Sequence, residues 1–228
     1  MSDNPEVTIR VIAILGGTGK EGKGLAFAWA KAGYKILIGS RQVEKAQTAA
    51  EDVRQMMTGT ADIHGVTNPE AAEQADIVVM TVPFAAHRTM LESVKANLAG
   101  KILVDVTVPL VPPKVTKVQM PPAGSAAQEA KEIVGEATEV VAAFQNISYE
   151  NLLSGEGVEC DVLVTGSSKA ARETVIKLVE DAGLIGWDAG PIENSVVVEG
   201  LTSILIGLNK KYGVESSGIR ITGIPRRT

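Results

Sequence analysis

The sequence predicts an α/β fold, with a doubly wound, mostly parallel sheet and a smaller C-terminal α/β portion. Three observations predict it. Through the first half of the chain, short apolar segments alternate with segments of helical period, as in successive strand–helix–strand units. A glycine-rich turn separates the first predicted strand from the first predicted helix. Aromatic residues make up only 4% of the chain, so Val, Ile, Leu and Ala must fill the core.

The predicted strands of the first half are nearly continuous apolar runs rather than alternating ones. Such runs are typical of parallel strands that helices cover on both faces. Right-handed crossovers are expected between them. The segments are Ile9–Leu15, Tyr34–Gly39, Asp76–Val82, Lys101–Val106 and Val140–Phe144.

The segments between these strands have helical composition or period. In the third of them, Asn68 is a plausible N-cap and Pro69 a suitable first residue. In the fifth, Ser125 and Gly135 are the expected start and stop signals. The predicted helices are Lys20–Ala32, Val43–Met57, Asn68–Gln74, Phe84–Leu98 and Ser125–Gly135.

The second half begins with a proline-rich segment, Thr107–Gly124, which is predicted to be a long loop and therefore a candidate functional segment. A further strand–helix–strand unit and a final helix follow. Apolar residues surround more than one face of that final helix, so it is expected to be buried against its own domain or a second subunit. These elements are Asp161–Thr165, Lys169–Ala182, Leu184–Trp187 and Asn194–Tyr212.

Composition excludes several classes of function. The 228 residues include 22 basic and 27 acidic ones, for a net charge of -5, which argues against nucleic-acid binding through a basic face. One cysteine, Cys160, fits a reducing cytoplasm, and one cysteine with two histidines offers no zinc-ligand set. The polar N-terminus shows no signal peptide, and no apolar run suggests a membrane span.

The strongest motif lies between the first strand and the first helix. Gly17, Gly19 and Gly22 form a G-x-G-x-x-G pattern in the position of a dinucleotide fingerprint, which makes the predicted fold Rossmann-type. In that motif Gly17 permits the tight turn, Gly19 admits the pyrophosphate, and Gly22 allows close packing of the helix. The helix N-terminus then offers free N–H groups to the phosphates. An ordinary glycine-rich turn is the alternative.

The second predicted strand indicates which dinucleotide binds. A site for NAD usually has an acidic residue about 20 residues beyond the glycines, to hold the ribose 2′-hydroxyl. Positions 39 to 43 contain no acid here; Ser40 and Arg41 follow the strand, with Lys45 one helical turn on. These three side chains can converge on a 2′-phosphate, so NADP(H) is predicted. Solvated residues at a helix start are the alternative for Arg41 and Lys45.

The ends of two later strands are candidates for the nicotinamide side, because ligands bind outside the carboxyl ends of strands in open α/β sheets. The first is Thr81, Val82, Pro83 and Phe84, and the second includes Val106 and Thr107. Packing turns at strand ends are an equally good interpretation of both.

The sequence offers few candidates for acid–base chemistry, and we name no catalytic residue. His64 is expected at the surface and Cys160 in the core. His87 could face the cofactor, although a role as proton shuttle is disfavoured, and Asp105 is either a satisfied buried residue or a site carboxylate. This scarcity suggests chemistry in which positioning is enough, such as direct hydride transfer between two redox rings.

Over nearly its whole length, the sequence resembles the NADPH-dependent F420 reductases. The first shared segments are the glycine loop Leu15–Gly19, Gly39–Arg41 with Lys45, and Thr81–Pro83. The first two of these also occur in other NADP enzymes, and the combination with the later segments is more specific. Those later segments are Val108–Pro112, Asp188–Pro191 and Glu199–Thr202.

The resemblance implies a hydride passed between nicotinamide C4 and C5 of the deazaflavin coenzyme F420, with a homodimer as the common assembly. By position, it places Thr18, Gly19, Lys20 and Glu21 at the pyrophosphate, Ser40, Arg41 and Lys45 at the 2′-phosphate, and Val82 and Pro83 at the nicotinamide. It also implies a division into an NADP-binding domain, residues 1–144, and a C-terminal portion, residues 145–228, that covers the acceptor and forms the dimer interface.

The sequence departs from the family on the acceptor side. A His followed by a Thr-x-Pro-like stretch is frequent there, and this chain has Phe144–Ser148, in which Gln145 and Asn146 could bond the acceptor. Phe84 stands where an aromatic residue, often Trp, follows the proline, and the proline-rich loop is longer than usual. Reduction of a flavin, imine or carbonyl by NADPH, and NADP sensing without catalysis, therefore stay open as alternatives.

Overall fold

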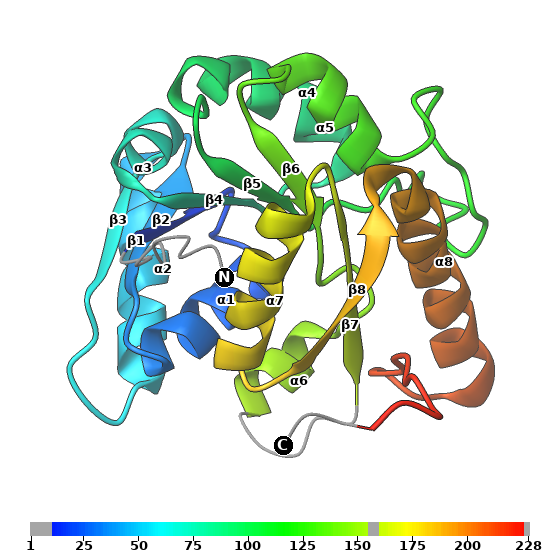
Figure 1. Cartoon of the computed structure of the whole chain (residues 1–228). Helices are drawn as coiled ribbons and strands as arrows, with labels where there is room; N and C mark the ends of the chain where they lie inside the picture. The colour runs from blue at the N-terminus through cyan, green and yellow to red at the C-terminus, as the bar shows by residue number, and fades with distance from the viewer. Residues whose placement is uncertain (1–10, 155–159, 226–228) are drawn as a thin grey trace.

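A computed structural model describes residues 11–154 and 160–225 of the chain. Its strands form one eight-stranded sheet in the order β3-β2-β1-β4-β5-β6-β7-β8 (Figure 1). All neighbouring strands pair in parallel except β6 and β7, which are antiparallel. The Rossmann-type, doubly wound and mostly parallel sheet is thus confirmed.

The strands are short, and those inside the sheet are largely buried, as expected for a sheet covered on both faces, whereas the edge strands β3 and β8 are mostly half-buried or exposed. Residues Ile9 and Arg10 of the first predicted strand lie outside the described residues. The strands are β1 Val11–Leu15, β2 Lys35–Ser40, β3 Ile63–Thr67, β4 Ile77–Met80, β5 Ile102–Asp105, β6 Glu139–Ala142, β7 Asp161–Gly166 and β8 Ile185–Pro191.

The helices follow the predicted order with small changes at their ends. The predicted helix Phe84–Leu98 is divided into α4, Phe84–Val94, and a 3-10 turn, Lys95–Asn97. A second 3-10 turn, Ile192–Asn194, precedes the last helix. The other helices are α1 Lys20–Lys31, α2 Val43–Met56, α3 Asn68–Gln74, α5 Ala126–Val134, α6 Tyr149–Ser154, α7 Lys169–Asp181 and α8 Ser195–Tyr212.

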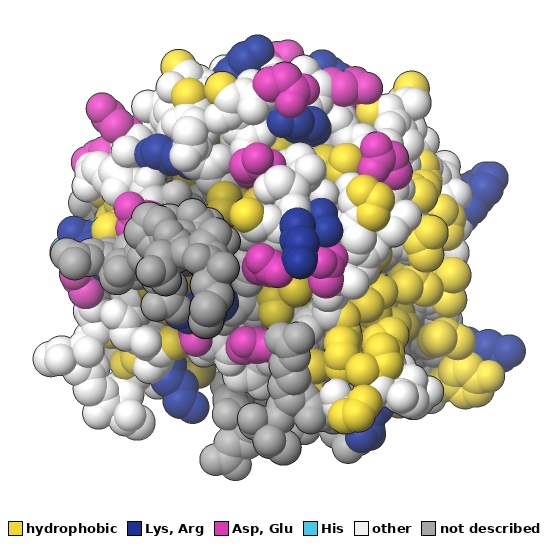
Figure 2. All heavy atoms as spheres, viewed as in Figure 1, with side chains coloured by type: hydrophobic (Ala, Val, Ile, Leu, Met, Phe, Trp, Pro, Cys, Tyr) yellow, Lys and Arg dark blue, Asp and Glu magenta, His cyan; other side chains and the backbone are white. Residues whose placement is uncertain are grey.

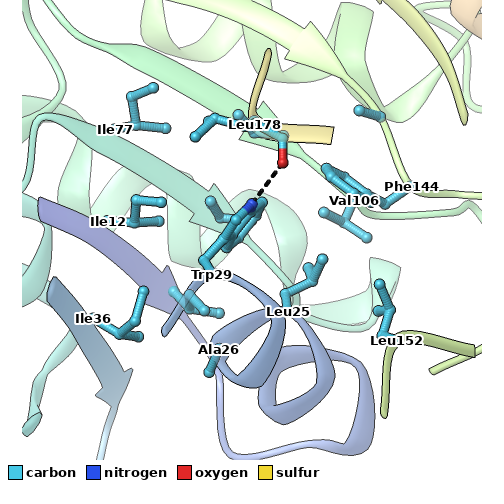
Figure 3. Close-up of a cluster of buried hydrophobic side chains, with 14 of the residues drawn as sticks. Ile12, Leu25, Ala26, Trp29, Ile36, Ile77, Val106, Phe144, Leu152 and Leu178 are labelled. Carbon is cyan, nitrogen blue, oxygen red and sulfur yellow. Dashed lines mark hydrogen bonds between the residues drawn. The ribbon is translucent and has the colours of Figure 1, made fainter. Parts of the chain in front are cut away.

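Helices cover the sheet on both faces and create two hydrophobic clusters. The larger cluster lies under α1, α2 and α7 and is centred on the fully buried Trp29. The Trp29 indole meets Phe144 edge to face at 5.6 Å between ring centroids and donates a hydrogen bond to the Leu178 carbonyl (Figure 3). The second cluster lies under α3, α4 and α5.

The C-terminal portion extends the same sheet. Strands β7 and β8 follow β6 at one edge, so the 144/145 boundary falls between hydrogen-bonded neighbours. The division into two domains at that point remains a prediction. None of the helices in the described parts of the chain is long and apolar enough to cross a membrane.

Three local features differ from the sequence-based expectations. Strand β3 was not predicted, because it contains His64 and Gly65 and lies at the sheet edge with few apolar residues. Helix α6 was also not predicted. The N-cap of α3 is Thr67, whose hydroxyl accepts from the Glu70 N–H, rather than Asn68. By contrast, Ser125 and Gly135 cap α5 as predicted.

Candidate functional site

A cleft of about 700 Å³ lies at the carboxyl ends of the central strands, the position where α/β sheets bind ligands. Its volume falls in the usual range for small-molecule sites. Five predicted site residues line it, namely Thr18, Ser40, Arg41, Lys45 and Val82. Its other lining residues are Gly16, Gln42, Thr67, Asn68, Pro69, Ala85, Ala86, Thr89, Met90 and Ser93.

The glycine loop at the cleft is packed so closely that most of its glycines are required. An added Cβ at Gly17 would lie 2.7 Å from the Ile14 carbonyl oxygen, and one at Gly22 would lie 2.5 Å from the Gly17 Cα. A Cβ at Gly19, in contrast, would meet nothing within 4 Å. The space beside Gly19 is thus open, which leaves room for the close approach of a ligand that the motif predicts there.

One detail of the loop differs from the prediction. The residue with positive φ is Gly16, at 66°, and not Gly17. A Cβ at Gly16 would also lie 2.4 Å from Val82 Cγ1, so this glycine brings the loop against the end of β4. The role of Gly17 is therefore close packing on β1, whereas the left-handed turn belongs to Gly16.

Helix α1 begins directly behind the loop and presents its N-terminus there. Its N-cap is Gly19, which provides no side-chain hydrogen bond, so N–H groups of the first turn are available to an anion. The loop is held by two hydrogen bonds, from the Gly17 N–H to the Gly39 carbonyl and from the Gly16 N–H to Asn68 Oδ1. This role of Asn68 was not predicted from the sequence, because it depends on β3, the unpredicted strand that places Asn68 there.

Lys20 and Glu21, which the family resemblance places at the pyrophosphate, do not line the cleft. Lys20 Nζ bonds the Tyr149 hydroxyl at 2.9 Å. Burial raises the pKa of Glu21 to about 8, and its Oε1 has no hydrogen-bond partner within the described residues. A carboxyl group that stays protonated near neutral pH avoids repelling a pyrophosphate at the helix N-terminus.

Cationic side chains gather at the end of the cleft formed by β2 and α2. Arg41 and Lys45 are exposed there, and neither forms a salt bridge within residues 11–154 and 160–225. Ser40 Oγ accepts the Gln42 N–H, which leaves its own proton free to donate. No acidic residue lines the described cleft. This end therefore favours a phosphate over a bare ribose hydroxyl.

The opposite end of the cleft, called the apolar end below, is lined mostly by apolar residues of the β4 end and α4, with Thr89 and Ser93 as the polar ones. Strand-end hydrogen bonds fix this end. Val82 lines it, while Pro83 and Phe84 begin α4. The Thr81 hydroxyl donates to the Leu15 carbonyl, and the Val106 N–H donates to the Met80 carbonyl. Thr107 is buried and its hydroxyl reaches the Val82 carbonyl at 3.4 Å. These residues hold the wall in place.

Gln145 and Asn146 lie after β6, are buried, and are not among the cleft-lining residues. Their amide nitrogens donate to the protein, Gln145 to the Asp105 carbonyl and Asn146 to the Val198 carbonyl and the Thr202 hydroxyl. The amide oxygens of both have no partner in the described chain.

The remaining candidate residues differ in their burial. His64 is exposed and Cys160 is buried, as expected. His87 is fully buried and does not face the cleft; its Nε2 lies 2.7 Å from Asp105 Oδ2. Burial alone would lower the pKa of His87, but the carboxylates of Asp105 and Glu129 outweigh it and raise that pKa. His87 and Asp105 were both candidates from the sequence, but their pairing was not predicted.

A second buried carboxylate joins the last helix to this region. Glu199 of α8 accepts the backbone N–H groups of Ala126 and Ala127 at the start of α5. Burial raises the pKa of Glu199 to about 8, against the lowering effect of those two N–H groups. Glu199 therefore anchors α8 on the helix that also carries Glu129.

Comparison with known proteins identifies the family. The profile of the family described as "NADP oxidoreductase coenzyme F420-dependent" matches residues 11–109. The chain is 40% identical over 221 residues to an F420-dependent NADP reductase of Methanocaldococcus jannaschii, covering 93% of this chain and 98% of that protein. It is also 40% identical over 230 residues to the protein of that name from Methanothermobacter thermautotrophicus, covering 97% and 99%.

The chain belongs to the coenzyme F420-dependent NADP oxidoreductase family. Among solved structures, a putative F420-dependent NADP reductase from Arthrobacter sp. FB24 has a TM-score of 0.78 at 24% identity, covering 94% of this chain and 99% of that one. That likeness concerns the fold. The family resemblance expected from the glycine loop and the later motifs is thus confirmed.

Proposed function

We propose that this enzyme transfers a hydride between NADP(H) and coenzyme F420. The observation that carries the cofactor assignment is the cleft itself, with an open glycine loop at a helix N-terminus and with Arg41 and Lys45 at one end, where neither forms a salt bridge among the described residues. The acceptor assignment rests on the family, whose curated relatives are named F420-dependent NADP reductases.

The residues of the cleft fit NADP along its length. Thr18, Gly19 and the first N–H groups of α1 would hold the pyrophosphate, and Ser40, Arg41 and Lys45 the 2′-phosphate. Val82 and Pro83 would lie at the nicotinamide, with Phe84, Thr81, Val106 and Thr107 shaping and supporting that wall. Bound NADPH supplies the hydride from nicotinamide C4.

The chain's contribution to the reaction is binding, orientation and exclusion of water. In the direction from NADPH to F420, the C4–H bond of NADPH would break, and F420 would gain the hydride at C5 and one proton from solvent. No general base would have to remove a proton from a substrate in this direction, so alignment of the two rings is the main demand. Gln145 and Asn146 are proposed to lie on the acceptor side. Gln145 donates to the Asp105 carbonyl at the end of β5, and Asn146 donates to the Val198 carbonyl of α8.

The assembly is proposed to be a homodimer, formed through α8 in the portion 145–228. Several large apolar side chains of α8 are exposed, and Figure 2 shows hydrophobic atoms gathered on the right of that view, where α8 lies in Figure 1. They are Val196, Val197, Ile204, Leu208 and Tyr212. A site of action in the cytoplasm is proposed from the single cysteine.

The test follows oxidation of NADPH and, in parallel, of NADH by the purified protein, with F420, FMN and FAD offered separately. We expect turnover with F420 and little with either flavin. Turnover with a flavin alone would overturn the acceptor assignment, and a preference for NADH would overturn the cofactor assignment.

A further inference from the structure

Behind the apolar end of the cleft lies a buried ion pair between an imidazole and a carboxylate. His87 of α4 and Asp105 at the end of β5 are 0% and 1% exposed, and their Nε2 and Oδ2 atoms are 2.7 Å apart. Neither lines the cleft, and with both side chains buried neither presents a surface to a ligand. Burying such a pair contributes little net stability, because desolvation offsets the attraction. Its location therefore suggests a positional role.

Asp105 connects the two sides of the proposed reaction centre. Its second carboxylate oxygen, Oδ1, accepts the Thr107 N–H at 3.0 Å, and the Thr107 hydroxyl reaches the Val82 carbonyl. Its backbone carbonyl accepts the Gln145 amide at 2.7 Å. One residue thus holds the cofactor wall at Val82 and the acceptor-side segment at Gln145 in a fixed relation.

His87 extends this connection to the first turn of α4. Its ring stacks on Phe84, with centroids 5.9 Å apart and planes inclined by 29°. Phe84 directly precedes Ala85 and Ala86, which line the cleft. The hydrogen bond to Asp105 therefore links the start of α4 to the end of β5 from behind the cleft wall.

Other charged groups surround the pair. From α5, Glu129 Oε1 lies 3.5 Å from His87 Nδ1, which itself has no hydrogen-bond partner in the described structure. Arg88 of α4 pairs with Glu129, and Glu199 of α8 interacts electrostatically with both His87 and Asp105. The carboxylates of Asp105 and Glu129 favour the imidazolium form of His87.

We propose that the His87–Asp105 pair is a positioning device for hydride transfer, which sets the placement of the Val82 wall relative to the Gln145 segment. The inference rests on the proposed function, because it assigns the two sides to cofactor and acceptor. Hydride transfer requires the reacting atoms at close approach, and a misplacement of about 1 Å can cost roughly 100-fold in rate. Loosening this pair should therefore slow the chemical step more than it weakens binding.

The test compares wild type with Asp105→Asn and His87→Gln in single-turnover reduction of F420 by NADPH. Both variants keep a hydrogen-bonding side chain of similar size but remove the ion pair. The matched control is Asp62→Asn, which breaks an exposed His–Asp pair, His64 with Asp62 at 2.6 Å, far from the cleft. Thermal unfolding is measured for each variant, so that the rate refers to folded protein.

We expect the rate of hydride transfer in both buried-pair variants to fall about 10-fold or more. The dissociation constant of NADPH should stay within about twofold, because the phosphate contacts are untouched. The primary isotope effect with 4-deuterated NADPH should rise in steady-state turnover, as hydride transfer becomes more rate-limiting, and the control should match wild type.

A single-turnover rate within about twofold of wild type in a folded variant would overturn the proposal, even if the variant unfolds at lower temperature, because that is the signature of a purely structural pair. If Asp105→Asn does not fold, His87→Gln decides, since it leaves Asp105 its backbone partner at Thr107. Failure of the wild-type protein to reduce F420 would instead overturn the proposed function. The two failures are thus distinguishable.

Discussion

Replacing Arg41 by alanine should separate NADPH from NADH. Arg41 is exposed at the cationic end of the cleft and forms no salt bridge within the described residues, so its charge is available to a ligand. NADH lacks the 2′-phosphate that this charge would meet. The variant should therefore bind NADPH more weakly while its affinity for NADH barely changes.

The magnitude follows from the exposure of the side chain. A hydrogen bond to a charged group contributes about 1.5–3 kcal/mol, and solvent screening at an open site favours the lower end. A loss of about 1.5 kcal/mol corresponds to roughly a tenfold rise in the dissociation constant. Lys45 remains in the variant and retains part of the attraction, which also argues against a much larger loss.

The assay is fluorescence titration of NADPH and NADH with the wild type, Arg41→Ala and a control, Arg54→Ala. Arg54 lies on the same helix, α2, but pairs with Glu51 and bonds the Ile63 carbonyl away from the cleft. The control should leave the NADPH-to-NADH affinity ratio unchanged. Equal weakening of NADPH and NADH by Arg41→Ala would refute the 2′-phosphate assignment.

Three further predictions follow from the packing. Gly19→Ala should leave the melting temperature nearly unchanged but weaken NADPH binding in titration, because its Cβ enters the space proposed for phosphate. Gly22→Ala should lower both the melting temperature and the NADPH affinity, because its Cβ meets the loop backbone. Equal effects of the two substitutions would contradict this account. The raised pKa of Glu21 means that the folded state holds a proton which the unfolded state loses, so stability should fall as pH rises from about 4.5 to about 8. Glu21→Gln should reduce this fall of the melting temperature with pH. An unchanged dependence of the melting temperature on pH would exclude Glu21 as its source. Trp29→Phe removes the hydrogen bond to Leu178 and should cost about 1–3 kcal/mol in urea unfolding, whereas a loss below about 0.5 kcal/mol would show that the bond contributes little.

Most of the fold was predictable because its signals are local. Continuous apolar strands, helical period and the glycine loop each depend on neighbouring residues, and the structure has strands and helices at nearly all the predicted places. Strand β3 and the short helix α6 are exceptions. An edge strand with His64 and Gly65 gains its structure from pairing with β2 rather than from its own composition. Missing β3 also concealed Asn68, whose contact with Gly16 spans 52 positions.

The lining of the cleft was predictable at one end and not at the other. The end proposed to hold the phosphates consists of residues close in sequence, such as Thr18 beside the glycines and Ser40 beside Arg41, so their spacing makes them candidates. The apolar end depends on long-range contacts, such as His87 with Asp105 and Gln145 with Asp105. No pattern in the sequence shows which distant polar residues pair once the sheet has formed.

The central claim is that a hydride passes directly from the nicotinamide to F420 in this protein. The most direct measurement uses NADPH carrying deuterium at one or the other hydrogen position of C4, followed by mass spectrometry of the reduced F420. The account predicts one deuterium in the product from one of the two labelled forms and none from the other. Reduced F420 without deuterium from either form, or no reduction of F420 at all, would contradict it.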